Sequence, residues 1–187
     1  MSVPDDHKLV EARDFKFCPW CGSPLEYRRL DNAVRSACPS CEYIWYKNPI
    51  PATGAIIVDD NRLLLVKRRH PPKVGDWCIP AGFMEYDESP VECCIREIKE
   101  ETGLDIKIDR LFWNYKAGDD PRSMVVLILY LATVVDGELV PGDDAMETRY
   151  FDLEKLPSNI AFSAHQRAIK DLKKYLKDGK LPRENER

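Results

Sequence analysis

The sequence lacks the features that mark membrane, secreted and nucleic-acid-binding chains. Its longest apolar run, "MVVLILYLATVV" at 124–135, is too short to span a bilayer as a helix. The opening residues, "MSVPDDHKLVEARDFKF", have no apolar core of the kind that a signal peptide needs. Basic residues are not in excess, since 28 Lys and Arg face 32 Asp and Glu, and a net charge of −4 argues against a general nucleic-acid binder. We therefore expect a cytoplasmic protein with no membrane attachment.

The composition is that of a globular chain with one full-sized domain and a small appendage. Of its 187 residues, 44% are apolar and 32% are charged, and there is no internal repeat or low-complexity segment. The composition changes at "KNPIPATGAIIV", where a segment rich in cysteine and aromatic residues gives way to apolar strands. We expect an N-terminal unit over residues 1–47 and a second domain over residues 48–187, whose charged end "KDGKLPRENER" frays into solvent.

Seven cysteines, two of them adjacent, make a poor disulfide framework, and reduced thiols are the better interpretation. Four of them form the pairs "CPWC" and "CPSC", which 16 residues separate: Cys18, Cys21, Cys38 and Cys41. This spacing favours a tetrahedral zinc site with four cysteine ligands, a zinc ribbon, over a redox pair. Because the segment has no core of its own, the zinc is expected to supply its folding energy. Few basic residues lie between the pairs, so we favour a structural or dimer-forming role.

Strands and two separated helices are expected in the second domain, which predicts an α/β/α layered fold with a mixed sheet. The turn-type cluster Asp59-Asp60-Asn61 joins two apolar strands. A helix over residues 89–102 has Ser89 as N-cap, Glu92 completing a capping box, and Gly103 just past its end. Strands are expected at 105–113, 124–135 and 148–151, and a last helix at 163–177.

The helix at 89–102 carries an unusual cluster of acids. Glu97, Glu100 and Glu101 are three and four residues apart, so a helix places all three on one face, where like charges repel. A hard divalent cation such as Mg²⁺, which prefers oxygen ligands, is the natural partner, and a solvated acidic face is the alternative. Cys93 and Cys94, one turn earlier, are expected to pack closely rather than to bind metal.

The flanking residues extend this cluster into a longer pattern. Residues 82–104, "GFMEYDESPVECCIREIKEETGL", fit G-x5-E-x7-R-E-U-x-E-E-x-G-U at every position, where U is a bulky aliphatic residue. This resembles the Nudix box, and the strand order around it suits a Nudix domain. The resemblance implies hydrolysis of nucleoside diphosphates linked to another moiety, by attack of water on phosphorus.

The same resemblance implies roles for individual residues. Glu97, Glu100 and Glu101 would bind Mg²⁺ or Mn²⁺, with the backbone carbonyl of Ala81 or Gly82 as a further ligand. Arg96 would orient these carboxylates by ion pairing, and Glu88 would lie in the supporting loop. A further carboxylate often comes from a later loop, for which Glu147 is the best candidate, with a surface acid as the alternative.

Several residues near the box are candidates for contacts with the substrate. Trp77, Trp113 and Tyr115 are candidates to stack on a base, although core packing is the more common fate of such residues. Arg122 is a candidate to meet a phosphate or a ribose, with a surface arginine as the alternative. His70 and His165 are isolated, and no role is expected for them.

A zinc ribbon before a Nudix domain resembles the NADH, ADP-ribose and FAD pyrophosphatases. The region after the box, "YKAGDDPRSMVVLILY", departs from the array of the NADH group, whereas Pro121 resembles a proline of ADP-ribose hydrolases. The segment "LPSNIAFSAHQRAIKDLKKYL" is similar to the FAD-cleaving group. We expect a Mg²⁺-dependent homodimeric enzyme that converts ADP-ribose to AMP and ribose 5-phosphate, with FAD or NADH as alternatives. A non-catalytic nucleotide-binding module with a partner-docking ribbon is the rival from another class.

Overall fold

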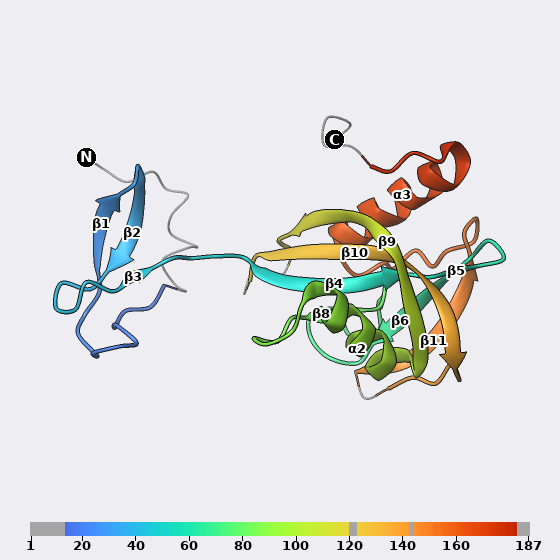
Figure 1. Cartoon of the computed structure of the whole chain (residues 1–187), viewed down its shortest axis with the longest axis horizontal. Coiled ribbons are helices and arrows are strands. Elements are labelled where there is room, and N and C mark those ends of the chain that lie inside the picture. The colour runs from blue at the N-terminus through green and yellow to red at the C-terminus, as the bar shows by residue number, and fades with distance from the viewer. Residues whose placement is uncertain (1–13, 120–122, 143, 183–187) are drawn as a thin grey trace. The chain divides into compact units, whose positions relative to one another are not determined.

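The computed structural model describes residues 14–119, 123–142 and 144–182, and it separates the chain into two units, Met1–Asn48 and Pro49–Arg187 (Figure 1). The first unit contains an antiparallel sheet of β1 (Glu26–Leu30), β2 (Ala33–Ala37) and β3 (Ile44–Trp45). Asp31 and Asn32 make the turn between β1 and β2, and their φ angles of 48° and 63° give the left-handed backbone of a tight hairpin.

The second unit contains two sheets. One has the order β8-β4-β10-β9, and in the other β11, β6 and β5 are adjacent, with β7 also paired to β6. The pairing of β4 with β10 is parallel and the remaining pairings are antiparallel, so the expected mixed sheet is confirmed. The strands are β4 (Ile50–Ile56), β5 (Val58–Asp59), β6 (Arg62–Arg68), β7 (Trp77–Cys78), β8 (Ala81–Phe83), β9 (Leu104–Ala117), β10 (Val125–Gly137) and β11 (Ala145–Asp152).

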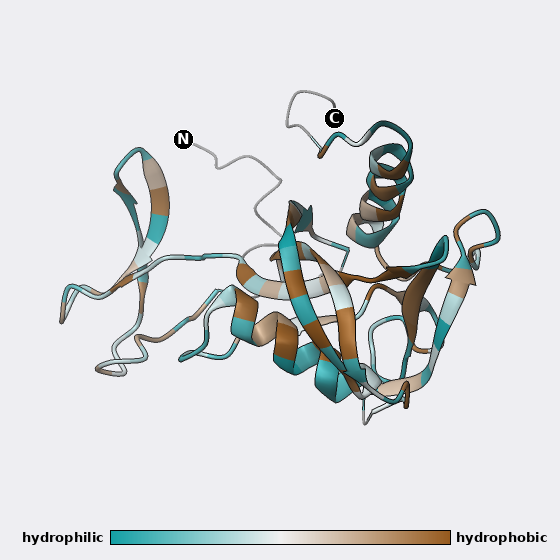
Figure 2. Cartoon of the chain, turned by 45° about the vertical axis from the view of Figure 1, so that its right-hand side comes forward, coloured by the Kyte–Doolittle hydropathy of each residue, from teal (hydrophilic) through white to brown (hydrophobic). Residues whose placement is uncertain are grey.

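The helices α2 (Pro90–Thr102) and α3 (Ser163–Asp178) belong to two different apolar clusters. Cys94 and Ile98 of α2 pack with Leu64, whereas Ala168 and Leu172 of α3 pack in the cluster that contains the neighbouring Leu63 and Leu65. Alternate residues of β6 thus serve opposite clusters, as the period of a strand requires. In Figure 2, brown and teal segments alternate around α2, as expected for a helix with one buried side.

The predicted ends of α2 are confirmed. The Ser89 hydroxyl accepts from the N–H of Glu92, the Glu92 carboxylate accepts from the N–H of Ser89, and Gly103 ends the helix with a φ of 75°. The start of α3 is held by a residue that is distant in the sequence: one carboxylate oxygen of Asp119 accepts hydrogen bonds from both the N–H and the hydroxyl of Ser163.

Two expectations about strands need correction. The turn at Asp60 and Asn61 exists, with φ angles of 45° and 60°, but only Val58–Asp59 pairs with β6 across it. Most of the preceding apolar run belongs to β4, which pairs with β8 and β10 in the other sheet. The strand expected at 105–113 continues to Ala117, because β10 pairs with it along its length. Within the described residues, no helix has the length and apolar character needed to cross a membrane.

Candidate active site

The guanidinium of Arg96 is the centre of an ion-pair network on α2. It donates to both carboxylate oxygens of Glu88 at 2.6 and 3.0 Å, to Glu97 at 2.8 Å and to Glu100 at 3.0 Å. It also donates to the carbonyl of Phe83 at 3.1 Å, which ties the helix to β8. Hydrogen bonding from Arg96 lowers the pKa of Glu88 to about 2. The expected role of Arg96, to orient the acids of the box, agrees with these contacts.

Glu97 and Glu101 lie against β8. An added Cβ on Gly82 would lie 2.0 Å from the carboxyl carbon of Glu97, so only glycine leaves room for this side chain. The N–H of Ala81 donates to Glu101 at 2.9 Å. Burial raises the pKa of both acids, and the neighbouring Glu97 helps to bring that of Glu101 to about 8. Two adjacent, partly desolvated carboxylates of this kind are suited to a hard divalent cation, which would compensate their charge.

These two acids line a cavity of about 320 Å³, here called the carboxylate cavity. The other lining residues are Val66, Arg68, His70, Ala81, Gly82, Phe83, Glu85 and Asp144. Glu100 is not in this lining: its side chain is 58% exposed and its carboxylate lies on Arg96. The expected participation of Glu100 in metal binding therefore stays a prediction.

The acid that this later segment contributes to the lining of the carboxylate cavity is not the expected Glu147. Glu147 does not line the carboxylate cavity; it lies beside Arg149 and 3.8 Å from Lys67 in the β11–β6 pair. Asp144, just before β11, lies in the lining instead and is 3.3 Å from His70. A register shift between Ala145 and Glu147 separates these two acids. We therefore replace Glu147 by Asp144 as the candidate from this loop.

The loop that carries Asp144 is attached to the end of α2. The N–H of Val140 donates to the carbonyl of Thr102 at 2.9 Å, and that of Gly142 donates to the carbonyl of Glu101 at 3.1 Å. An added Cβ on Gly142 would lie 1.7 Å from the carbonyl oxygen of Glu100, so the approach admits only glycine. These bonds satisfy carbonyls that a helix end leaves without partners.

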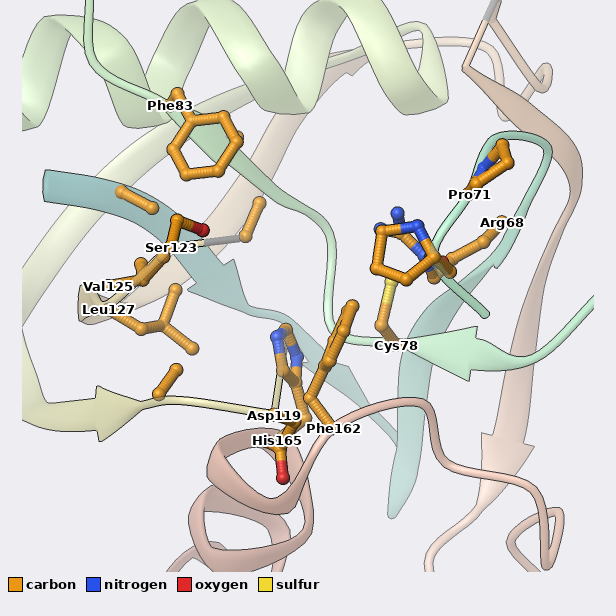
Figure 3. Close-up of a pocket in the computed structure, with 15 residues that line it drawn as sticks. Arg68, Pro71, Cys78, Phe83, Asp119, Ser123, Val125, Leu127, Phe162 and His165 are labelled. Carbon is orange, nitrogen blue, oxygen red and sulfur yellow. The ribbon is translucent and has the colours of Figure 1, made fainter. Parts of the chain in front are cut away.

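A second cavity, of about 180 Å³, adjoins the first and is here called the apolar cavity (Figure 3). It shares Arg68, Ala81, Gly82 and Phe83 with the carboxylate cavity. Its remaining lining residues are Ala52, Pro71, Pro72, Cys78, Ala117, Asp119, Ser123, Val125, Leu127, Phe162 and His165. In Figure 3, Phe162 and His165 point into it from the start of α3, with Phe83 on the opposite side.

The predicted stacking residues are mostly in the core. Trp77 is 7% exposed and Tyr115 1% exposed, and both belong to the hydrophobic core, so the expectation that either stacks on a base is wrong. Trp113 is half-buried and packs against the same core. Pro121 and Arg122 lie outside the described residues, although Asp119 and Ser123 on either side line the apolar cavity.

The lining residues that sequence reasoning missed include Arg68, Phe83, Phe162 and His165. The basic run "KRRH" and the segment "AFSAH" contain three of them, but neither segment shows by itself that it meets the other. The Arg68 guanidinium, which lines both cavities, lies 5.0 Å from the centre of the Phe162 ring, which lines the apolar cavity alone.

The four cysteines of the first unit come together as expected. Their sulfur atoms all lie within 4.8 Å of one another, the one group of three or more potential ligands this close in the part of the chain that the structure describes. Cys18 and Cys41 are 3.6 Å apart, and Cys21 and Cys38 are 3.4 Å apart. Gly22 and Glu42 follow the two pairs with φ angles of 75° and 61°, so Glu42 adopts the backbone that glycine adopts in the first loop. The arrangement fits a tetrahedral zinc ion.

Known proteins match both units. The family model described as "NUDIX domain" matches residues 48–172, and the one described as "Nudix N-terminal" matches residues 16–47. An ADP-ribose pyrophosphatase of Methanocaldococcus jannaschii is 44% identical over 131 residues, which are 70% of this chain and 76% of that protein. The NAD-capped RNA hydrolase NudC of Vibrio atlanticus is 30% identical over 174 residues, but this chain spans only 61% of its length. The crystal structure of a Nudix hydrolase from Nitrosomonas europaea superposes with a TM-score of 0.78 at 33% identity, covering 89% of this chain and 95% of that one.

Proposed function

The chain belongs to the Nudix hydrolase family, and from that premise we propose that it hydrolyses the pyrophosphate bond of a nucleoside diphosphate linked to another moiety. The observation that carries the proposal is the pair of adjoining cavities. One is lined by carboxylates and the other is largely apolar, and they share a wall at β8 and Arg68. A substrate with a charged centre and a planar apolar end needs this combination.

The carboxylate cavity is the proposed site of the pyrophosphate and of Mg²⁺ or Mn²⁺. Glu97 and Glu101 would hold the cation, with Glu100 at the rim and the carbonyl of Ala81 or Gly82 as further ligands. A bound divalent cation supplies neutralisation of phosphate charge and a more acidic water molecule. Arg96 fixes the carboxylates before substrate arrives, because it already pairs with Glu97 and Glu100.

In the proposed reaction, a water oxygen bonds to one phosphorus as the bond from that phosphorus to the bridging oxygen breaks. One phosphate leaves with the bridging oxygen and the other gains the water oxygen, so ADP-ribose yields AMP and ribose 5-phosphate. Arg68 lies in the linings of both cavities and is suited to hold a phosphate oxygen at their junction, since its guanidinium presents forked donors.

ADP-ribose is the proposed first substrate, because the relative that bears this activity in its name is 44% identical over most of this chain. A second candidate class is the NAD group, either NADH or NAD-capped RNA. It is favoured by one observation: the alignment with NudC covers 87% of this chain, whereas that with the ADP-ribose pyrophosphatase covers 70%. FAD remains a third candidate, because the segment that contains α3 is similar to the FAD-cleaving group.

The test is product analysis after incubation with Mg²⁺ and ADP-ribose, FAD, NADH, NAD⁺ or an NAD-capped oligonucleotide. Glu101→Gln serves as the matched inactive control, because it keeps the size of the side chain and removes its charge. The expected result is AMP from ADP-ribose with wild-type protein and a loss of several orders of magnitude in the variant. No turnover of any compound would refute the proposal and favour a nucleotide-binding module without catalysis.

A further inference from the structure

Next to the lining residues Cys78 and Phe162 of the apolar cavity runs a backbone ladder that a histidine completes. Trp77 donates its N–H to the carbonyl of Asn159 at 3.0 Å, and Ala161 donates to the carbonyl of Trp77 at 2.8 Å. In a parallel ladder the next bond would run from the N–H of Ile79 to the carbonyl of Ala161. The chain turns into α3 at this point, and the N–H of Ile79 donates instead to Nδ1 of His165 at 3.2 Å.

This bond fixes the chemical state of the imidazole. Because Nδ1 accepts a hydrogen bond, it must carry a lone pair, and the ring proton of a neutral histidine then lies on Nε2. His165 is 7% exposed, and its burial lowers its pKa to about 4. The imidazole is therefore neutral near pH 7, with a fixed tautomer.

The Nε2–H of this tautomer is directed to the cavity. His165 belongs to the lining, and Figure 3 shows its ring pointing into the space between Phe83, Leu127 and Phe162. Within the described residues, Nε2 has no hydrogen-bond partner. The atom is also not fully buried, so a ligand in the cavity can reach it. Asp119, the carboxylate of the lining, accepts two hydrogen bonds from Ser163.

We propose that His165 is a specificity-determining residue whose Nε2–H donates a hydrogen bond to a ring-nitrogen acceptor of the purine that occupies the apolar cavity. This inference rests on the proposed function, since it concerns the nucleoside end of that substrate. The surrounding lining is mostly hydrocarbon and aromatic, which suits a planar ring. A neutral donor in such a lining selects rings with an acceptor at that point, because a ring without one leaves the N–H unpaired and desolvated.

Two substitutions separate recognition of the ligand from support of the backbone. In His165→Asn the amide oxygen takes the place of Nδ1 and accepts from Ile79, but no donor remains where Nε2 was. In His165→Gln the amide reaches the place of Nε2, but the acceptor for Ile79 is lost. Lys170→Gln, an exposed change on the same helix, is the control.

The measurement is calorimetric binding of AMP and of 1-deaza-, 3-deaza- and 7-deaza-AMP to each full-length protein. With wild type, one of the three analogues should bind about three- to tenfold more weakly than AMP, the factor of one neutral hydrogen bond. The His165→Asn variant should bind AMP more weakly than wild type by the same factor. It should bind that analogue as tightly as wild type does. In steady-state kinetics with ADP-ribose, it should raise KM by a similar factor and leave kcat unchanged.

A purely structural histidine gives a different pattern, in which His165→Asn behaves as wild type and no analogue distinguishes the two proteins. That result, or failure of AMP to bind wild type, would overturn the inference. Hydrolysis of ADP-ribose with unchanged KM in His165→Asn would overturn it while the proposed function stands. The binding data decide the role of His165 even if none of the pyrophosphates is hydrolysed.

Discussion

Replacement of Gly82 by alanine is expected to abolish most activity without weakening the fold. The new Cβ would lie between 2.0 and 2.2 Å from the carboxyl atoms of Glu97, whereas ordinary contact begins at 3.4 Å, so the carboxylate must retreat by about 1.4 Å. A displacement of about 1 Å at a reacting centre can cost about 100-fold in rate. We expect kcat/KM for the preferred substrate to fall by about that factor.

Stability should respond in the opposite sense to activity. The backbone of Gly82 is not left-handed, and the obstructing atoms belong to the end of a flexible side chain. Alanine at a compatible position stabilises a protein by about 0.4–1 kcal/mol through the unfolded state. The melting temperature should therefore be unchanged or slightly raised, as measured by calorimetry.

Gly54→Ala is the matched contrast on the neighbouring strand. Its Cβ would lie 2.4 Å from the backbone oxygen of Pro80, which cannot swing aside, so this variant should melt at a lower temperature. In the double variant Gly82→Ala with Glu97→Asp, the shorter aspartate side chain makes room for the methyl group. Its kcat/KM should therefore fall by less than the product of the factors lost in the two single variants. Wild-type kcat/KM in Gly82→Ala would refute the reasoning, and so would a strongly lowered melting temperature.

Three other perturbations have expected outcomes. Glu101→Gln should melt at a higher temperature than wild type at pH 9 with chelator present, because burial raises the pKa of Glu101 to about 8 and its charge is then unfavourable; equal melting would contradict this. In the folded state the pKa of His165 is about 4, whereas its ordinary value is 6.5. As the pH falls, the unfolded state therefore binds a proton on this side chain before the folded state does, and the free energy of unfolding should fall by about 3 kcal/mol between pH 6.5 and 4. Urea titrations should show this loss in wild type relative to His165→Asn, and parallel curves would exclude it. Cys38→Ser should reduce the zinc content of the protein below one equivalent and make the first unit more sensitive to protease. An unchanged zinc content would argue against a site built from all four cysteines.

The elements that could be predicted from the sequence are those fixed by local chemistry. The capping residues of α2 and the left-handed Gly103 define its ends without reference to the rest of the chain, and the structure confirms them. The likeness to the Nudix box is confirmed by the family match over residues 48–172. The cysteine pairs likewise specify their own cluster, because each pair is one short loop.

The parts that escaped prediction depend on segments far apart in sequence. Trp77 is buried because β7 pairs with β6 and packs against Phe151, which no local pattern reveals. Arg68 and Phe162 meet across almost a hundred residues, and their contact exists only once α3 has docked. Asp144 lines the carboxylate cavity and Glu147 does not, and the register shift between Ala145 and Glu147 that lies between them is not visible in the sequence.

The bonds from Val140 and Gly142 to the end of α2 have a mechanical consequence. They attach the loop before Asp144 to the helix that bears Glu97 and Glu101, so two of the elements that contribute acids to the cavity are connected by backbone hydrogen bonds. A displacement of α2 would therefore also displace the residues of this loop that are bonded to it, Val140 and Gly142. Changes of substrate through loop variation are therefore expected at the apolar cavity, where Asp119 and Ser123 flank the connection between β9 and β10, rather than at this attachment.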